Sequence, residues 1–408
     1  MNVKKIILVL LFIAFVAFLA FSLYWVFFRT APPLDQTPDD FNAGDIPSIG
    51  PGDVTIIGQD EDTTGQQLPW QAFVKDQVSP VANGGLTEVR ELVDREVKGL
   101  LPTSSGLQYY DGAQQQFFRM DENGQIIALS DKKFFQVDKV TWDANGDKAI
   151  LEYPDGMNIL YNFRTQEQVT LPIELEDFSF NSSGSQIAAK WIGDSSANNW
   201  LIAANDDGSG MYLVEPLGDN AHTVQVGFSP DNQVVALHSK STGVDSQEVY
   251  PLGLKGENLK AFAVSGAGFT SQWSPQGNSL LYSVYNEQNN YNPNLWVTKG
   301  NTSQLGDIKV SLNLATWPEK CSFVGENSLY CAVPQGLPRG AGLFPEIAND
   351  YPDNFYSIDL NSGQRTMLAS PVGSRGGYSA YNLFVSADGS FLYFTDANTG
   401  TLQSIRLR

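Results

Sequence analysis

The sequence predicts an all-β protein, a seven-bladed β-propeller preceded by one transmembrane helix and a flexible tether. Three observations lead to this prediction: residues 6–28 are apolar apart from Ser22, residues 31–78 are rich in Pro, Gly and Asp, and a hairpin signature recurs from residue 86 onward. The expected boundaries are 1–30 for the anchor, 31–78 for the tether and 79–408 for the propeller domain.

Residues 6–28 predict a membrane-spanning helix, because at about 1.5 Å per residue this run exceeds the roughly 30 Å of bilayer hydrocarbon. Lys4 and Lys5 before it favour a cytoplasmic N-terminus, and Tyr24 and Trp25 suit a membrane interface. A cleaved signal peptide is the alternative, although its apolar region is usually about 7 to 15 residues. We therefore expect a single-pass cell-membrane protein with an extracytoplasmic propeller.

Residues 31–78 contain the stretches APPLDQTPDD, IPSIGPGD and GQDEDTTGQQ, with hardly any apolar periodicity. Such composition is typical of a flexible, disordered chain. The segment would hold the following domain away from the membrane.

The chain is acidic, with 45 Asp and Glu against 25 Lys and Arg and a formal net charge of −20. A negative surface repels phosphate backbones, so nucleic-acid binding is excluded as an expectation. Basic partners, divalent cations or solubility alone remain compatible with this charge.

The repeated hairpin is clearest at residues 272–283, QWSPQGNSLLYS, where an aromatic residue precedes a Ser-Pro-x-Gly turn and an apolar strand follows. Pro275 presets φ for a turn and Gly277 supplies a positive φ. Taking the residue four before the turn's Gly or Asn as a marker, variants occur at Pro102, Trp142, Phe180, Phe228, Trp273, Phe323 and Val385. Units of about 40 to 60 residues with several short strands predict a propeller. If PTSSG after Leu101 is not a turn, the blade count is six.

Two of these turns, Trp273-Ser274-Pro275-Gln276-Gly277 and Phe228-Ser229-Pro230-Asp231-Asn232, resemble the turn of the TolB-type, WD40-like propeller repeat of bacterial extracytoplasmic proteins. Other copies depart from it: Asp143-Ala144 and Asn181-Ser182 replace Ser-Pro, and Gly325 interrupts the sixth. The resemblance implies the fold rather than an activity, since propellers host unrelated functions.

A closed propeller has to join its ends, because an open blade exposes unpaired strands. The last unit provides three strands, YNLFVS, SFLYFTD and TLQSIRLR. We expect Leu86–Leu92 to pair with Leu402–Leu407 as the missing outer strand; a short helix is the alternative for the same segment. The aromatic markers are expected to pack between blades.

Catalytic and metal-binding candidates are few. His222 and His238 stand outside metal or nucleophile motifs, and no Gly-x-Ser-x-Gly elbow occurs. The acidic stretches 143–147 and 205–210 read as hairpin turns before cation loops. No cofactor and no metal are expected, and an enzyme is the less favoured class.

The sixth unit carries a long insertion, GLPRGAGLFPEIANDYPD (336–353). Long loops on rigid scaffolds often recognise ligands, so we expect Arg339, Phe344 and Pro345 to be contact residues. The alternative is a loop that only covers the channel or packs on the next blade.

These features predict a membrane-anchored propeller that acts as a protein- or ligand-binding scaffold of the cell envelope. The alternative is an extracytoplasmic enzyme whose site is assembled in the channel from several blades. A third class is an envelope-assembly subunit held by a helical partner in the membrane.

Cys321 and Cys331 flank the sixth turn almost symmetrically, so on a hairpin they should stand opposite each other with Cα atoms about 4.5 to 5.5 Å apart. An oxidising compartment and an even cysteine count favour a disulfide. Two buried, reduced thiols are the alternative.

Overall fold

The computed structural model describes residues 15, 18, 78–121, 123–373 and 377–408. The chain divides into two compact units, Met1–Pro69 and Trp70–Arg408, and the second contains all the strands. The predicted anchor and tether lie outside the described residues, apart from Phe15, Phe18 and Val78. Within the described ranges, no helix has the length and apolar character needed to cross a bilayer.

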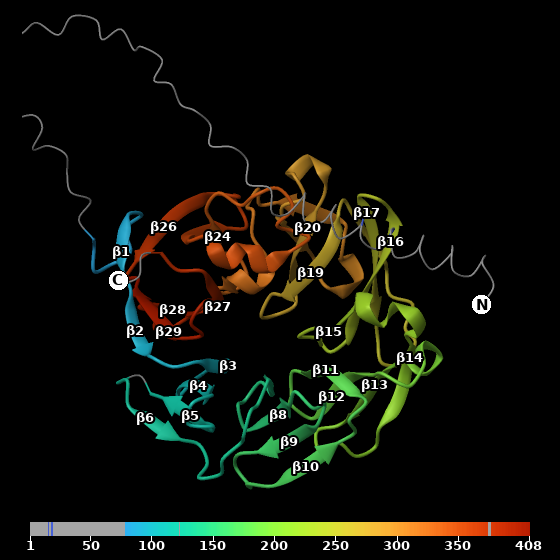
Figure 1. Ribbon diagram of the computed structural model, residues 1–408. Helices are drawn as coiled ribbons and strands as arrows, with labels where there is room; N and C mark the ends of the chain where they lie inside the picture. Colours follow the sequence, from blue (N-terminus) through green and yellow to red (C-terminus); the bar gives the residue numbers. More distant parts are fainter. Residues whose placement is uncertain (1–14, 16–17, 19–77, 122, 374–376) are drawn as a thin grey trace, which may run out of the picture. The chain divides into compact units, whose positions relative to one another are not determined.

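Residues 86–406 form seven sheets arranged as blades around a centre, so the seven-bladed prediction is confirmed (Figure 1). Blade 1 comprises β3 (Val97–Thr103), β4 (Gly106–Asp111), β5 (Gln116–Met120) and β6 (Ile126–Ala128). Blade 2 comprises β7 (Lys139–Trp142), β8 (Lys148–Glu152), β9 (Asn158–Asn162) and β10 (Gln168–Leu171). Blade 3 comprises β11 (Leu175–Phe180), β12 (Gln186–Trp191), β13 (Trp200–Asn205) and β14 (Tyr212–Pro216). Blades 4 and 5 comprise β15 (Val224–Val226), β16 (Ala236–Gly243), β17 (Ser246–Leu252), β18 (Phe262–Val264); and β19 (Ala267–Trp273), β20 (Ser279–Tyr285), β21 (Asn294–Lys299), β22 (Ile308–Ser311). Blade 6 contains β23 (Cys321–Phe323), β24 (Ser328–Pro334), β25 (Asp353–Asp359) and β26 (Arg365–Val372), and blade 7 contains β27 (Ala380–Val385), β28 (Phe391–Asp396) and β29 (Leu402–Arg406).

Short 3₁₀ helices occupy several connections: η2 (Ser196–Asn198), η3 (Gly218–Thr223), η4 (Glu287–Asn289), η5 (Thr302–Gln304), η6 (Pro318–Lys320) and η7 (Pro345–Asp350). Because the strands of a blade are antiparallel, its connections alternate between two ends. We call the end with the repeat turns the turn end. The loop end carries the connections between second and third strands.

The N-terminal segment closes the ring, but in a different way from the one predicted. β1 (Leu86–Glu88) adds in parallel to Ser370–Val372 of β26, and β2 (Arg90–Val93) pairs antiparallel with β29. The expected pairing with Leu402–Leu407 is confirmed for Arg90–Val93 and wrong for Leu86–Glu88, and the helix alternative is wrong. The reason lies in β26, the last of the four strands that blade 6 builds from its own repeat: its outer edge is unpaired unless another segment covers it, and β1 covers Ser370–Val372.

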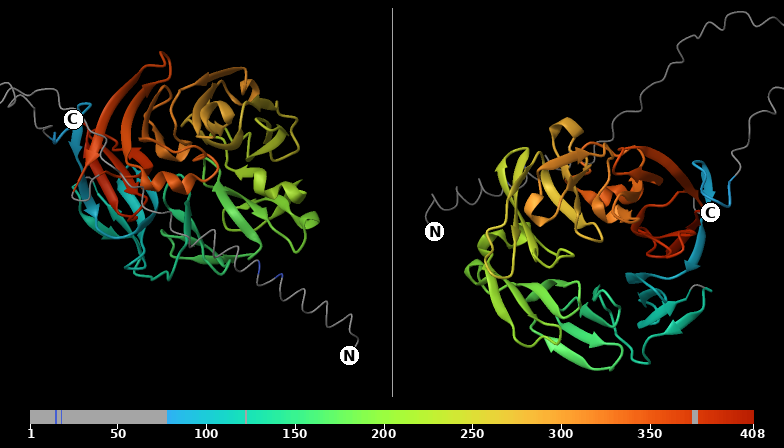
Figure 2. Two further views of the ribbon diagram at one scale, coloured as in Figure 1. Left: turned by 45° about the horizontal axis from the view of Figure 1, so that its top comes forward. Right: turned by 180° about the vertical axis from the view of Figure 1, so that it is seen from behind.

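The segment before β1 is fixed as well. Ser79 forms a bridge to Thr87, and its N–H donates to the Leu86 carbonyl at 2.8 Å. Residues 79–93 therefore lie across the outer edges of blades 6 and 7, and both views of Figure 2 show this segment next to the C-terminus.

The repeat turns keep one chemical feature even where their sequences differ. The side-chain oxygen of the residue after the marker accepts the backbone N–H five residues later, whether it is Ser274 (3.0 Å), Asp143 (2.8 Å) or Asn181 (3.1 Å). Ser229 and Ser386 do the same. The turn's last residue has positive φ, as predicted for Gly277 (75°) and also for Asn232 (59°). The degenerate copies at Asp143 and Asn181 are therefore equivalent in this hydrogen bond to the Ser-Pro copies.

Apolar clusters fill the spaces between neighbouring blades. Trp142 of blade 2 packs among Phe117 of blade 1 and Phe163, and its indole N–H donates to the Gly99 carbonyl of blade 1 at 2.6 Å. The marker Trp273 packs against the cluster shared by blades 4 and 5. The prediction that marker aromatics pack between blades is confirmed at these positions.

Four first strands contain a β-bulge that the sequence did not reveal. Blades 1, 3, 5 and 7 each interrupt their innermost ladder at a residue with left-handed φ: Gly99, Asp177, Gly268 and Asn382. These residue types tolerate left-handed backbone better than branched side chains do. A bulge redirects the side chains beside it, which brings Asp177 towards the channel.

Candidate functional site

The long connection between β24 and β25 is the candidate site, and its backbone is held from both sides. Towards blade 5, it donates three hydrogen bonds to the β20–β21 connection: Gly340 N–H to the Asn290 carbonyl (2.9 Å), Gly342 N–H to the Tyr291 carbonyl (2.8 Å) and Ala341 N–H to Asn292 Oδ1 (3.1 Å). Towards blade 7, the Ala348 carbonyl accepts from Ser379 Oγ and the Asn349 carbonyl accepts from Asn398 Nδ2. The loop is therefore anchored on the loop end, across three blades.

The predicted contact residues lie on this loop in different roles. The Arg339 guanidinium lies 5.5 Å from the ring centroid of Tyr291, where a cation–π contact orients it. Phe344 is 56% exposed, and Pro345 begins η7 at the surface. Leu343, which is 49% exposed, was missed from the sequence. Consecutive exposed apolar residues on an anchored backbone form a preorganised contact surface, which we call the blade-6 tip (Leu343, Phe344 and Pro345).

A buried ion pair supports the base of this loop. Lys320 Nζ lies 2.9 Å from Asp353 Oδ2, and both side chains are almost fully buried. The Ala380 N–H also donates to Asp353 Oδ2, at 2.5 Å. Burial raises the pKa of Asp353 to about 6, although Lys320 and the Ala380 N–H act in the opposite direction. The loop therefore begins and ends beside a charged pair shielded from water.

The channel side of blades 2 to 5 contains a second polar cluster. A cavity of about 580 Å³ is lined there by residues that include Lys139, Asp177 and Lys190. Asp177 Oδ2 lies 2.6 Å from Lys190 Nζ and Oδ1 lies 3.3 Å from Lys139 Nζ, and Lys139 also pairs with Glu152. Burial opposes the shift, but the two lysines hold the pKa of Asp177 below its ordinary value. The charged groups of this cluster therefore pair with one another.

The two histidines do not join a reactive arrangement in the described part of the chain. His222 is exposed on η3, with Nδ1 3.0 Å from the Asp219 carbonyl oxygen. His238 lies on β16 beside Tyr250, and burial, aided by Lys240, lowers its pKa. The alternative of an enzyme site in the channel gains no support from these positions.

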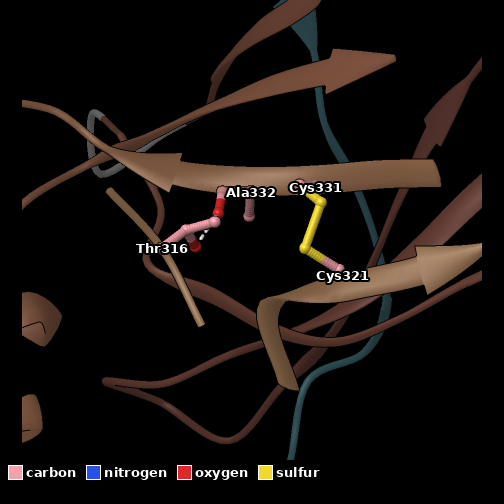
Figure 3. Close-up of a disulfide and its surroundings, with 4 residues drawn as sticks. All are labelled: Thr316, Cys321, Cys331 and Ala332. Atoms are coloured by element: carbon pink, nitrogen blue, oxygen red, sulfur yellow. Dashed lines mark hydrogen bonds between the residues drawn. A yellow bond between two sulfur atoms is a disulfide. The ribbon is translucent and has the colours of Figure 1, made fainter. Parts of the chain in front are cut away.

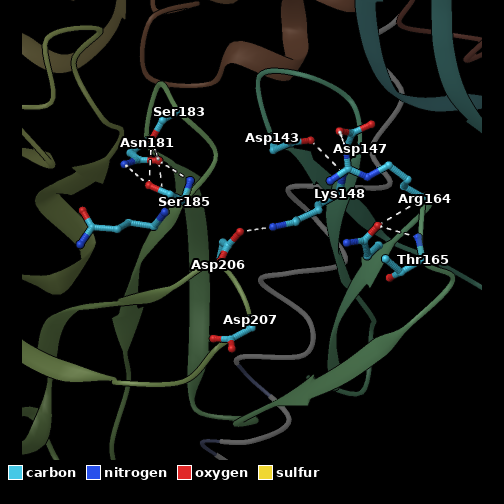
Figure 4. Close-up of polar contacts among 12 residues, drawn as sticks. Asp143, Asp147, Lys148, Arg164, Thr165, Asn181, Ser183, Ser185, Asp206 and Asp207 are labelled. Carbon is cyan, nitrogen blue, oxygen red and sulfur yellow. Dashed lines mark hydrogen bonds and ion pairs between the residues drawn. The ribbon is translucent and has the colours of Figure 1, made fainter.

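The acidic stretches considered as cation loops are turns linked to neighbouring basic groups (Figure 4). Asp143 accepts the Lys148 N–H, and Asp147 lies 3.6 Å from Arg164. The Lys148 ammonium pairs with Asp206 of blade 3. These contacts join the turn ends of blades 2 and 3.

Cys321 and Cys331 form a disulfide, as predicted (Figure 3). They are directly opposite in the β23–β24 ladder, with Cα atoms 4.1 Å apart. Beside them, Thr316 Oγ1 donates to the Ala332 carbonyl at 2.6 Å. The alternative of two reduced thiols does not hold in this structure.

No protein-family model matches the chain, and no curated protein matches it. Among solved structures, an oligogalacturonate lyase from Vibrio parahaemolyticus is similar, with 12% identity, a TM-score of 0.51, and coverage of 78% of this chain and 93% of that one. An oligogalacturonate lyase in complex with manganese has 12% identity, a TM-score of 0.49 and the same two coverages. The β-propeller domain of Cps50 (Swd1) from Myceliophteria thermophila has 10% identity and a TM-score of 0.48, and the match covers 78% of this chain and all of that one. At these identities the likeness concerns the propeller fold and extends to no activity.

Proposed function

We propose that this protein is a membrane-anchored, extracytoplasmic scaffold, a TolB-like propeller that binds a protein partner of the cell envelope through the blade-6 tip. The observation that carries the proposal is the exposure of Leu343 and Phe344 on a backbone held by hydrogen bonds from blades 5 and 7. Protein interfaces concentrate aromatic and large apolar anchors of this kind, and a fixed backbone reduces the entropy lost on binding.

The proposed membrane location is supported by the sequence. The apolar run of residues 6–28 follows Lys4 and Lys5, and the acidic, Pro-rich segment 31–78 comes next. The disulfide is compatible with an oxidising compartment outside the cytoplasm. Protease added to intact cells with opened outer layers should then release residues 79–408; protection until the membrane is lysed would contradict this location.

A site-specific crosslink tests the partner-binding role. A photoreactive benzoyl-phenylalanine at Phe344 in the full-length chain should capture one partner from native membranes. The matched control places the same group at Val324, an exposed apolar residue at the opposite end of the same blade. Capture from both positions, or from neither, would contradict the assignment of the blade-6 tip.

The partner should also respond to single substitutions. Phe344→Ser and Leu343→Ser remove apolar contact area without touching the hydrogen bonds that anchor the loop, so they should reduce capture while leaving the melting temperature unchanged. Unchanged capture with both variants would show that the tip is not the contact.

A further inference from the structure

A groove at the loop end of blade 3 combines an aromatic wall with an acidic rim. Its volume is about 480 Å³, and its lining includes Trp191, Trp200, Tyr212, Leu213, Glu174 and Asp194. It is separate from the blade-6 tip and from the channel-side cavity.

Two tryptophans form its inner wall. Trp191 ends β12 and Trp200 begins β13, and the two residues are directly opposite in the ladder. One side of each packs on the apolar cluster between blades 2 and 3, which fixes its position. Leu213 pairs with Ile202 of the same cluster and is 57% exposed, so the wall continues outward as an apolar surface.

The indole N–H groups of this wall are open donors. Neither Trp191 nor Trp200 donates a side-chain hydrogen bond within the described residues, and neither indole nitrogen is among the buried unpaired atoms. Trp142 provides the contrast, since its indole N–H is used by the Gly99 carbonyl. The two indole N–H groups of this wall are therefore accessible and unpaired among the described residues.

The rim is negative. Glu174 and Asp194 have no ion pair or side-chain hydrogen bond among the residues that the structure describes. The Glu174 backbone is nevertheless fixed, because its carbonyl accepts the Ile192 N–H at 2.8 Å. Unpaired carboxylates beside an aromatic wall favour a ligand that carries positive charge.

We propose that this groove binds a proline-rich peptide segment in the polyproline II conformation that carries basic side chains. Such segments dock into aromatic-lined grooves in several domain families, because the preformed helix loses little entropy. Proline has no N–H, so these segments present backbone carbonyls, which the two indole N–H groups match. Glu174 and Asp194 would pair with a flanking Arg or Lys.

Charge selects among proline-rich segments. The chain's own stretch APPLDQTPDD (31–40) has the proline content but three aspartates, so the rim repels it. Changing those aspartates to arginine gives APPLRQTPRR, which keeps every proline and reverses the charge. A third peptide, AAALRQTARR, keeps the charge and removes the prolines.

Binding of the three labelled peptides to the full-length chain in detergent micelles, followed by fluorescence anisotropy, tests the proposal. APPLRQTPRR should bind, and the other two should bind at least about tenfold more weakly. Trp191→Phe with Trp200→Phe removes the donors and keeps the rings, and should weaken binding about tenfold, as should Glu174→Gln with Asp194→Asn. Trp142→Phe is the matched control and should leave the affinity unchanged.

Fluorine NMR of the chain containing 5-fluorotryptophan locates the site. Of the signals from the eight tryptophans, the two that disappear in Trp191→Phe and Trp200→Phe should move on adding APPLRQTPRR. If the double tryptophan variant fails to fold, the rim variant Glu174→Gln with Asp194→Asn still tests the proposal, because it changes only two side chains at the surface. Equal binding of AAALRQTARR, unchanged affinity of the rim variant, or movement of those signals by chito-oligosaccharide but not by peptide would each overturn the proposal.

Discussion

At the residue scale, the repeat turn depends on a side-chain acceptor more than on a particular amino acid. Ser274 Oγ accepts the N–H of Ser279 and donates to Glu326 of the sixth turn at 2.8 Å. Asp143 and Asn181 perform the acceptor role in their own turns. The Ser-Pro sequence is therefore one of several that can form this turn.

Ser274→Ala should lower the free energy of unfolding by about 1 to 3 kcal/mol, because it leaves the buried Ser279 N–H without its acceptor. Ser274→Asn should lower it less, since its amide oxygen reproduces the acceptor found at Asn181. Urea unfolding of both variants checks the prediction, and equal losses would contradict it.

The Lys320–Asp353 pair gives a prediction with a pH signature. The pKa of Asp353 is raised to about 6 from its ordinary value near 3.8, so the folded state holds this proton more tightly than the unfolded state does. The stability associated with that proton is complete below about pH 4 and is lost as the pH rises through about 6. Acid therefore relieves the cost of the buried carboxylate.

Lys320→Met should lower the free energy of unfolding by about 3 to 5 kcal/mol at pH 8, where it leaves an unpaired buried carboxylate, and by less at pH 5, where the carboxyl is protonated. Asp353→Asn is the control, because it removes the carboxyl group that titrates, so its cost should not shrink in acid. Urea unfolding at the two pH values distinguishes them; a cost of Lys320→Met that is independent of pH would refute this account.

Sequence reasoning singled out Arg339, Phe344 and Pro345 from the length of the insertion alone, and their role as contact residues stays a prediction. It could not find Leu343 or the Lys320–Asp353 pair, because their roles depend on which parts of blades 5, 6 and 7 meet. Trp191 and Trp200 were missed for a related reason: tryptophan within a propeller strand is usually packing, and only the structure shows which indole N–H groups lack a partner.

At the element scale, the sixth hairpin differs from the others in how it is held. Val324 stands where five other turns have Ser, Asp or Asn and the first has Thr103, and Gly325 takes the positive φ of 80°. No side-chain oxygen can close this turn, and the disulfide joins the two strands instead.

Cys321→Ser with Cys331→Ser should lower the free energy of unfolding by about 2 to 3 kcal/mol, the chain-entropy expectation for so short a loop. The matched comparison is the oxidised protein treated with reductant, which should lose the same amount. Mass spectrometry after alkylation without reductant should find neither cysteine labelled. Labelling of both would show that the native protein lacks the disulfide.

The elements themselves were predictable to different degrees. Turn chemistry and apolar strands such as Leu280-Leu281-Tyr282 are local signals, and the structure has the hairpins there. The division of the N-terminal segment at Val89 was not predictable, because it depends on two blades, 6 and 7, presenting their outer edges side by side. The bulges at Gly99, Asp177, Gly268 and Asn382 left only a weak signal, a turn-forming residue within a strand.

At the scale of the whole molecule, the N-terminal strands decide whether the ring is complete. Deletion of residues 85–92 removes β1 and most of β2, which exposes the edges of β26 and β29. The deleted protein should aggregate or melt at a much lower temperature, which light scattering during a thermal ramp would detect. A variant that melts like the intact protein would contradict closure by this segment. Two exposed substitutions that keep the strands, Glu88→Gln and Glu91→Gln, serve as controls and should change little.

The fold was predictable as a whole because one hairpin unit recurs. The copies whose sequences depart from the pattern could be recognised by comparison with the copies that match it. Location and partner were not resolved in the same way, since the predicted anchor lies outside the described residues and a binding surface is assembled from loops of several blades.

The pairing of β2 with β29 has a consequence for the timing of folding. The Glu91 carboxylate accepts a hydrogen bond from Gln403 across 312 residues of sequence, so β2, near the start of the propeller, waits during synthesis for β29, the last strand of the described residues. At roughly 5 to 20 residues per second, that wait is on the order of 15 to 60 seconds, during which β2 has no partner because β27–β29 of blade 7 have yet to be made. Blades 1 to 6 can form one after another from local hairpins in that interval, whereas the final step closes a very long loop and is slow for that reason. Interrupted synthesis would therefore leave a nascent chain with an open edge, a form that chaperones and proteases can tell from the finished ring.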